Sequence, residues 1–96
     1  AVFCINDALA AGALKALKKH NICIPEDVQI MSHEKTVFSE LTEPLLTSVD
    51  RNVESMAVQA CEKLMERMKK EHTDKTETVI IPFRVLEGGS TRPSEA

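Results

Sequence analysis

The chain has 96 residues, a formal net charge of −3, no Trp, no Tyr and only three Phe. At this length it can form one small domain at most, because such a chain hides only about 60–65 % of its unfolded surface. Nucleic-acid binding by this chain is not expected, since phosphate backbones attract clustered positive charge and bases stack on aromatic rings.

The three cysteines, Cys4, Cys23 and Cys61, are an odd number, lie far apart and form no C-x-x-C motif. We interpret them as small core residues of a protein in a reducing compartment, with neither a disulfide nor a metal site. No stretch approaches the roughly 18 apolar residues that a membrane span requires. We therefore expect a cytoplasmic protein with no membrane contact, no cofactor and no metal.

A buried strand at residues 1–5 and an amphipathic helix at residues 8–20 are the first predicted elements. The helix has apolar residues at helical spacing: Leu9, Ala13, Leu14 and Leu17. Asn6-Asp7 stands where a short polar side chain can cap the first helical turn, and Asn21 suits the position just after the helix. Capping by itself explains Asn6 and Asp7, and a ligand contact is the alternative.

A second apolar run at residues 28–31 completes a strand–helix–strand unit, whose strands are expected to be parallel. The carboxyl ends of both strands then lie side by side, where ligands bind in open α/β sheets. This arrangement brings His33-Glu34-Lys35 next to Asn6-Asp7. The triplet is either a solvated strand end or a ligand contact. Position 37 is Val rather than His, so the zinc-binding H-E-x-x-H pattern is absent, and we expect no catalysis.

Five further segments follow in the second half of the chain. We predict a helical turn at 37–43, a strand at 45–49, a long helix at 52–71, a strand at 78–83, and a frayed tail from residue 88. The long helix carries an apolar stripe that predicts core packing: Val53, Met56, Ala57, Ala60, Cys61, Leu64, Met65 and Met68.

Four motifs in order resemble the LacI/GalR family of bacterial transcription regulators. They are "AVFCINDALAAGALKALKKH", the Pro25–Val28 turn "PEDV", "EPLLTSVDRN", and "GGSTRP" near the end. The resemblance implies an α/β fold, namely a fragment of a two-lobed, periplasmic-binding-protein-like (type I) sandwich with parallel sheets. Residues 1–96 would be the C-terminal portion of the effector-binding and dimerisation domain, with the DNA-binding domain absent from this chain.

The resemblance also implies how the chain divides between lobes. Residues 1–49 would belong mainly to the C-terminal lobe and 50–82 mainly to the N-terminal lobe, while 83–96 would be the return crossing and tail. Operator DNA would be bound only through an N-terminal domain that this chain lacks.

Ligand contacts transfer from the family one position at a time. Asn6 matches a family position that often hydrogen-bonds a sugar hydroxyl, and Asp7, also a candidate ligand contact, starts the helix beside it. Glu34 stands in for a family aspartate, and Arg51 follows the strand that leads into the lobe crossing. The family usually has Gly and an aromatic residue where this chain has Ser32 and His33. Its second acidic or amide position is Lys35 here. With Arg51, that lysine favours a phosphorylated or acidic sugar, and loss of ordinary sugar recognition is the competing interpretation.

A homodimer interface is the second feature implied by the resemblance. The family builds it around the Ala-rich helix and the segment near residues 37–43, which here gives a candidate set: Ala8, Ala11, Gly12, Phe38, Leu41 and Thr42. The small residues also fit close packing within one subunit.

The expected function is a LacI-type transcriptional regulator that binds a small-molecule effector, a sugar or sugar derivative. Two alternatives share the architecture: a solute-binding protein of a sugar transporter, and an assembly module that has lost ligand binding. An exported binding protein fits less well with three unpaired cysteines. The coding sequence upstream of Ala1 would separate a regulator from an exported protein.

Overall fold

The computed structural model describes residues 1–69 and 76–93, which separate into two compact units. The first unit joins residues 1–50 to the C-terminal segment that begins at Arg84, and the second unit runs from Arg51 to Phe83. The chain passes between them at 50/51 and at 83/84. The assignment of each unit to a lobe stays a prediction.

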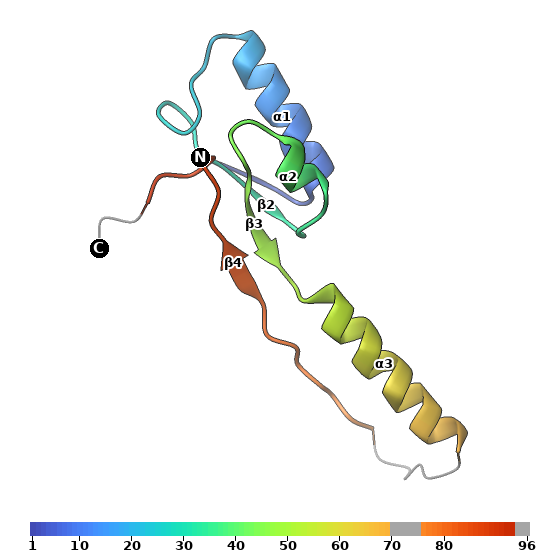
Figure 1. Ribbon diagram of the computed structural model, residues 1–96. Helices are drawn as coiled ribbons and strands as arrows, with labels where there is room; N and C mark the ends of the chain where they lie inside the picture. The colour runs from blue at the N-terminus through green and yellow to red at the C-terminus, as the bar shows by residue number, and fades with distance from the viewer. Residues whose placement is uncertain (70–75, 94–96) are drawn as a thin grey trace. The chain divides into compact units, whose positions relative to one another are not determined.

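The first unit is built on a four-stranded sheet in the order β1-β2-β3-β4 (Figure 1). β1 (Val2–Cys4), β2 (Ile30–His33) and β3 (Thr47–Asp50) are parallel, and the strand–helix–strand pattern predicts this direction for β1 and β2. β4 (Arg84–Leu86) pairs antiparallel with β3, so the expected all-parallel sheet is mostly rather than wholly parallel. The antiparallel direction follows because β4 enters from the second unit and runs back along β3.

α1 (Asp7–Lys19) covers one face of β1 and β2 and also contacts α2 (Phe38–Leu41). The buried apolar core consists of Ala10, Leu14, Ile30 and Leu46. Leu9, predicted to lie in the core stripe of the helix, is instead 56% exposed, because the helix is rotated so that Ala10 faces the sheet. Asn21 follows the helix with φ 61°, the left-handed conformation expected at that position.

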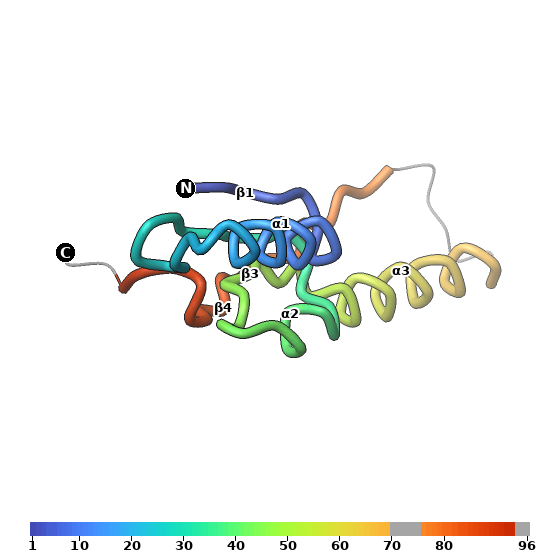
Figure 2. The backbone as a smooth tube through the Cα atoms, turned by 90° about the horizontal axis from the view of Figure 1, so that it is seen from above, coloured from blue at the N-terminus to red at the C-terminus, as the bar shows by residue number. Residues whose placement is uncertain are grey.

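The C-terminal segment is bound to the sheet through Ser90, which contradicts the prediction of a frayed tail for this part of it. The buried Ser90 hydroxyl accepts from the Thr47 amide at 2.8 Å and donates to the Ile30 carbonyl at 2.6 Å. Beside it, the Arg92 amide donates to Gln29 Oε1 at 2.7 Å, and Figure 2 shows this segment next to the turn that leads into β2. Fraying does not occur there because Ser90 satisfies polar groups at the starts of two strands.

Gly88 allows this close approach. A Cβ at residue 88 would stand 2.4 Å from the Leu45 carbonyl oxygen, which no side chain tolerates. The segment that the sequence identifies only as turn-like is therefore part of the folded unit.

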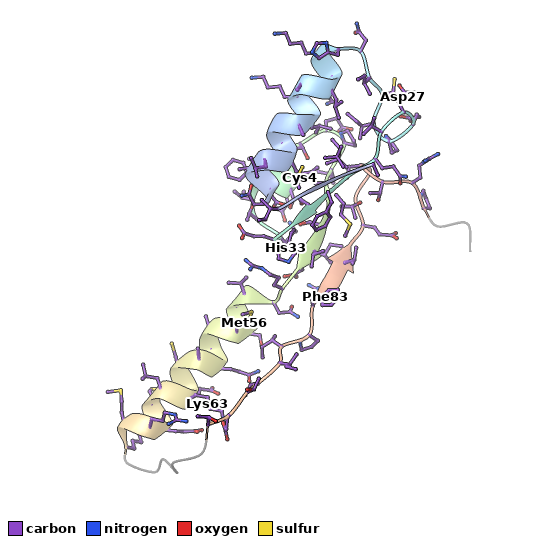
Figure 3. The ribbon with its side chains drawn as sticks, turned by 180° about the vertical axis from the view of Figure 1, so that it is seen from behind. Cys4, Asp27, His33, Met56, Lys63 and Phe83 are labelled. Atoms are coloured by element: carbon purple, nitrogen blue, oxygen red, sulfur yellow. The ribbon has the colours of Figure 1, made fainter. Side chains whose placement is uncertain are left out.

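The second unit consists of α3 (Val53–Met68) and the extended run 76–83, with no residue of α3 buried. The Met56 and Lys63 side chains lie on the helix face toward that run (Figure 3), where the Lys63 ammonium pairs with Glu77 at 2.9 Å. The predicted core packing of the α3 stripe is not observed in the described chain. The predicted strand at 78–83 is also absent, since no described strand pairs with it.

The cysteines are free thiols, but they are not all core residues. Cys4 is half-buried and packs against the core, while Cys23 and Cys61 are exposed. Cys61 is exposed because it lies on α3, whose apolar stripe is uncovered in the described chain.

Among the helices in the described ranges, none combines the length and apolar character needed to cross a membrane. Residues 1–69 and 76–93 also contain no group of three or more His, Cys, Asp or Glu side chains that could hold a metal ion.

The rotation of α1 gives a direct test of the core. Leu14→Ala is expected to lower the free energy of unfolding by about 2–4 kcal/mol, because it leaves a cavity beside Ile30. Leu9→Ala, on the exposed face, should change it by about 0.5 kcal/mol or less. Urea unfolding of both variants measures the difference; equal losses would place Leu9 in the core after all.

Candidate functional site

A buried carboxylate lies at the carboxyl edge of the sheet. Asp7, the first residue of α1, is only 1% exposed. Its Oδ1 accepts from the hydroxyls of Ser32 at 2.5 Å and Ser48 at 3.3 Å. Its Oδ2 accepts from Thr36, through both the backbone amide and the hydroxyl, each at 2.7 Å. One side chain thus connects α1, β2, β3 and the segment after β2.

These hydrogen bonds decide the charge of Asp7. Burial alone raises the pKa of the Asp7 carboxyl, but donation from Ser32, Thr36 and Ser48 outweighs it and holds the pKa below the ordinary value. The ionised form is therefore the stable one, because each donor points at a negative oxygen.

Thr36 continues the network toward α2. Its hydroxyl accepts from the Phe38 amide at 3.2 Å, and its carbonyl accepts from the Ser39 hydroxyl at 2.8 Å. The Ser39 carbonyl in turn accepts from the Leu46 amide ahead of β3. The short α2 is therefore held to the edge of the sheet through Thr36, and Ser39 is its buried residue.

His33 is the last residue of β2, so the triplet begins inside the strand rather than after it. Its ring contacts that of Phe3 with centroids 6.4 Å apart, and Figure 3 shows His33 at this end of the sheet. Glu34 has φ 80° and its amide donates to the Val49 carbonyl at 3.0 Å. Lys35 forms an ion pair with Glu40 of α2 at 2.7 Å.

Asn6 is the N-cap of α1, as the sequence predicts. Its Oδ1 accepts from the Leu9 amide at 2.9 Å. Capping uses the carbonyl end of the side chain, so the amide Nδ2 is the atom with which Asn6 could contact a ligand.

The structure brings Asn6, Asp7 and Glu34 to one edge of the first unit, whereas Arg51 is the first residue of the second unit. Ligand contact by these four residues stays a prediction. Both carboxylate oxygens of Asp7 accept from protein donors, which gives this residue a structural role that the sequence analysis did not assign.

The residues predicted for a dimer interface lie on α1, on α2 and at the C-cap of α2, and the two helices contact each other. Ala8, Gly12, Phe38 and Leu41 are exposed, while Ala11 and Thr42 are half-buried. A Cβ on Gly12 would meet open space, so this glycine is not required for packing within the chain.

Sequence reasoning did not identify the hydroxyl partners of Asp7. Ser32 was noted only as standing where the family usually has Gly and as a neighbour of His33, and Ser48 was given no role. One signal was available: in parallel strands that pair Ser32 with Ser48, two hydroxyls on the buried face need an acceptor. Asp7, at the start of the covering helix, is the nearest carboxylate in the strand–helix–strand unit.

Residues 1–91 match the family of periplasmic binding protein-like domains. A curated relative is the HTH-type transcriptional repressor PurR of Vibrio cholerae serotype O1 (strain M66-2), which is 38% identical over 73 residues. That alignment covers 75% of this chain and 22% of the relative. The chain thus spans less than a quarter of that relative's length.

Solved structures show the same similarity. A LacI-type transcription regulator from Bifidobacterium animalis subsp. lactis has a TM-score of 0.83 at 33% identity, covering 95% of this chain and 32% of that protein. A LacI family regulator from Enterococcus faecium with bound ribose has a TM-score of 0.85 at 26% identity, covering 98% and 35%.

The charge of Asp7 predicts a pH-dependent stability. Because the pKa of Asp7 is lowered on folding, its ionised form stabilises the fold above the ordinary value of 3.8, and this contribution is lost as the pH falls through the lower folded pKa. Asp7→Asn is therefore expected to cost about 2 kcal/mol of unfolding free energy near neutral pH. The gap from wild type should narrow as the pH falls below 3.8, when urea unfolding is followed from neutral to acidic pH. A gap that does not change with pH would show that the charge is not what the donors stabilise.

Proposed function

Because the chain belongs to the periplasmic binding protein-like domain family, in the form found in LacI/GalR regulators, we propose that it is the C-terminal part of the effector-binding domain of a transcriptional repressor. The rest of the protein, including the domain that binds operator DNA, would precede Ala1. In this proposal the first unit belongs to the C-terminal lobe and the second to the N-terminal lobe. The protein is cytoplasmic and has no catalytic role.

The proposed ligand is a small sugar, bound at the carboxyl edge of the sheet. The observation that carries this proposal is the placement of Asn6 and Glu34 at one strand edge, with an amide and a carboxylate that suit sugar hydroxyls. Ligand contact by Arg51 stays a prediction that the family resemblance implies. The ribose bound to the Enterococcus faecium regulator supports this ligand class.

A neutral sugar fits the local charges better than a phosphorylated one. Lys35, the cation that favoured an anionic ligand in the sequence analysis, pairs with Glu40 at 2.7 Å. Segment 34–40 contains Glu34, Lys35 and Glu40 as its charged residues, a net charge of −1. The net negative charge of this segment would repel a phosphate group. The local charges therefore favour a neutral sugar over a phosphorylated or acidic one.

Isothermal titration of the full-length protein tests this choice. D-ribose is expected to bind at least about tenfold more tightly than ribose 5-phosphate, because the net negative charge of segment 34–40 repels the phosphate group. Tighter binding of the phosphate would overturn the neutral-sugar assignment, and no binding of either probe or of a panel of neutral sugars would overturn sugar binding.

Asn6→Asp is the matched variant for the same titration. Aspartate keeps the capping oxygen but removes the Nδ2 donor, so the thermal midpoint should stay nearly unchanged. The sugar affinity should fall about tenfold with the lost hydrogen bond. Unchanged affinity would remove Asn6 from the site.

We further propose that the protein forms a homodimer through the exposed face of α1 and α2. The support is an apolar surface over both helices: Leu41 is 73% exposed and Phe38 48% exposed, beside the small residues Ala8, Ala11 and Gly12. Large apolar side chains clustered on a surface are typical of protein interfaces. Thr42 lies at the border of this surface.

Leu41→Arg tests the interface without disturbing the core, because this side chain is already exposed. The variant is expected to shift the light-scattering mass of the full-length protein from dimer to monomer, since it places a charge in an apolar contact. Glu26→Arg, an exposed change in the loop after α1, is the control and should leave the dimer intact. A dimeric Leu41→Arg protein would place the interface elsewhere.

A solute-binding protein of a sugar transporter and an assembly module without ligand are the alternative functions. The repressor name of the Vibrio cholerae relative favours the regulator over both. A signal peptide in the coding sequence upstream of Ala1 would favour the transporter protein instead.

A further inference from the structure

We propose that Asp7 is a positioning residue of the effector site: through Thr36 and Ser32 it holds the connection between β2 and α2, residues 34–37, in the conformation that presents Glu34. The inference rests on the proposed role of Glu34 in binding a sugar. Its first test follows the connection itself and needs no ligand.

The connection is anchored at two points. The Glu34 amide donates to the Val49 carbonyl of β3 at 3.0 Å, which holds its beginning. The Thr36 amide and hydroxyl both donate to Asp7 Oδ2 at 2.7 Å, which holds its end. Between these anchors the chain turns away from β2. Among the described residues, Asp7 is the only acidic side chain to which Thr36 donates a hydrogen bond.

The turn requires an uncommon backbone conformation at Glu34. With φ 80°, Glu34 is in the left-handed region, which residues with a Cβ seldom adopt. Such a conformation persists only where the surrounding contacts over-determine it. Thr36, two residues later, is the point at which Asp7 supplies that constraint.

A carboxylate suits this place better than an amide. The four bonds to Asp7 all come from donors, three hydroxyls and one backbone amide. An ionised carboxylate accepts at both oxygens, whereas the NH2 group of an asparagine would face donors on one side. Asp7→Asn keeps the size of the side chain and should release either Thr36 or Ser32.

Ser32 ties the same carboxylate to the sheet. It is buried in β2, pairs with Ser48 of β3, and donates to Asp7 Oδ1 at 2.5 Å. Asp7 therefore bridges a rigid part of the fold, the strands, and a part without regular structure, the connection. Loss of this bridge should loosen residues 34–37 before it loosens the strands.

Hydrogen–deuterium exchange of the full-length protein tests this order. In Asp7→Asn and in Thr36→Val, the amides of Glu34 and Thr36 should exchange about tenfold faster, the effect of one lost hydrogen bond to a charged group. In Thr36→Val, the amides of Val2 and Ile30, which donate to the carbonyls of Gln29 and Ser90, should keep their wild-type rates; in Asp7→Asn they should rise only with the general loss of stability.

Two matched variants separate positioning from general stability. Thr36→Ser keeps the hydroxyl and should restore wild-type exchange at Glu34. Ser48→Ala removes the longest of the four bonds, at 3.3 Å, without touching the connection, and should leave the Glu34 amide protected. The proposal is overturned if the exchange rate of the Glu34 amide rises no more than that of the Ile30 amide in both Asp7→Asn and Thr36→Val. If Asp7→Asn does not fold, the comparison of Thr36→Val with Thr36→Ser decides whether the connection is held in this way.

Titration with D-ribose as the probe gives the functional outcome. Thr36→Val should bind it about tenfold more weakly than Thr36→Ser, because the loosened connection no longer presents Glu34. Equal affinities of the two variants would overturn the link from Asp7 to the effector site. If the wild type binds no sugar, the proposed function fails, and the exchange rates alone still decide whether Asp7 positions the connection.

Discussion

The buried charge of Asp7 is the constraint on which the ligand edge of this protein depends. An ionised carboxylate removed from water is stable only where donors replace its hydration. Ser32, Ser48 and Thr36 provide those donors from three separate segments. Satisfying one charge therefore fixes the start of α1 against β2 and β3, and the segment that bears Glu34 against both.

A second set of polar contacts binds the same two strands. Ser90 bonds to the first residues of β2 and β3 from the C-terminal segment, while Asp7 bonds to Ser32 and Ser48, further along these strands, from α1. The core between them is small, with four buried apolar side chains among the described residues. Because so little apolar surface is buried, hydrogen bonds of hydroxyl and carboxylate groups determine much of the arrangement of the first unit.

The second unit differs in kind. α3 has an amphipathic sequence, yet the described residues bury none of it, and the run 76–83 beside it forms no paired strand. Both features follow from one cause: an apolar helical stripe and an apolar strand each require a partner element to cover them. In the proposed regulator the N-terminal lobe would supply those partners.

The sequence by itself determined the order and type of most elements, the parallel direction of the first two strands, and the meeting of Asn6-Asp7 with the Glu34 segment at one edge. These follow from local periodicity, from capping chemistry, and from the handedness of strand–helix–strand units. The same rules missed the ends of β2 and β3 by up to two residues, because strand bounds depend on pairing partners.

Only the tertiary structure decided which face of α1 is buried, with Ala10 in place of Leu9, and which groups satisfy Asp7. It also decided that Lys35 pairs with Glu40 and that Ser90 belongs to the fold. The physical reason is the same in each case. A helix can rotate by one residue with little change in its apolar pattern, and a polar side chain can be satisfied by any donor within reach. Apart from the local Lys35–Glu40 pair, which alternative wins depends on contacts between residues that are 25 to 60 positions apart in sequence.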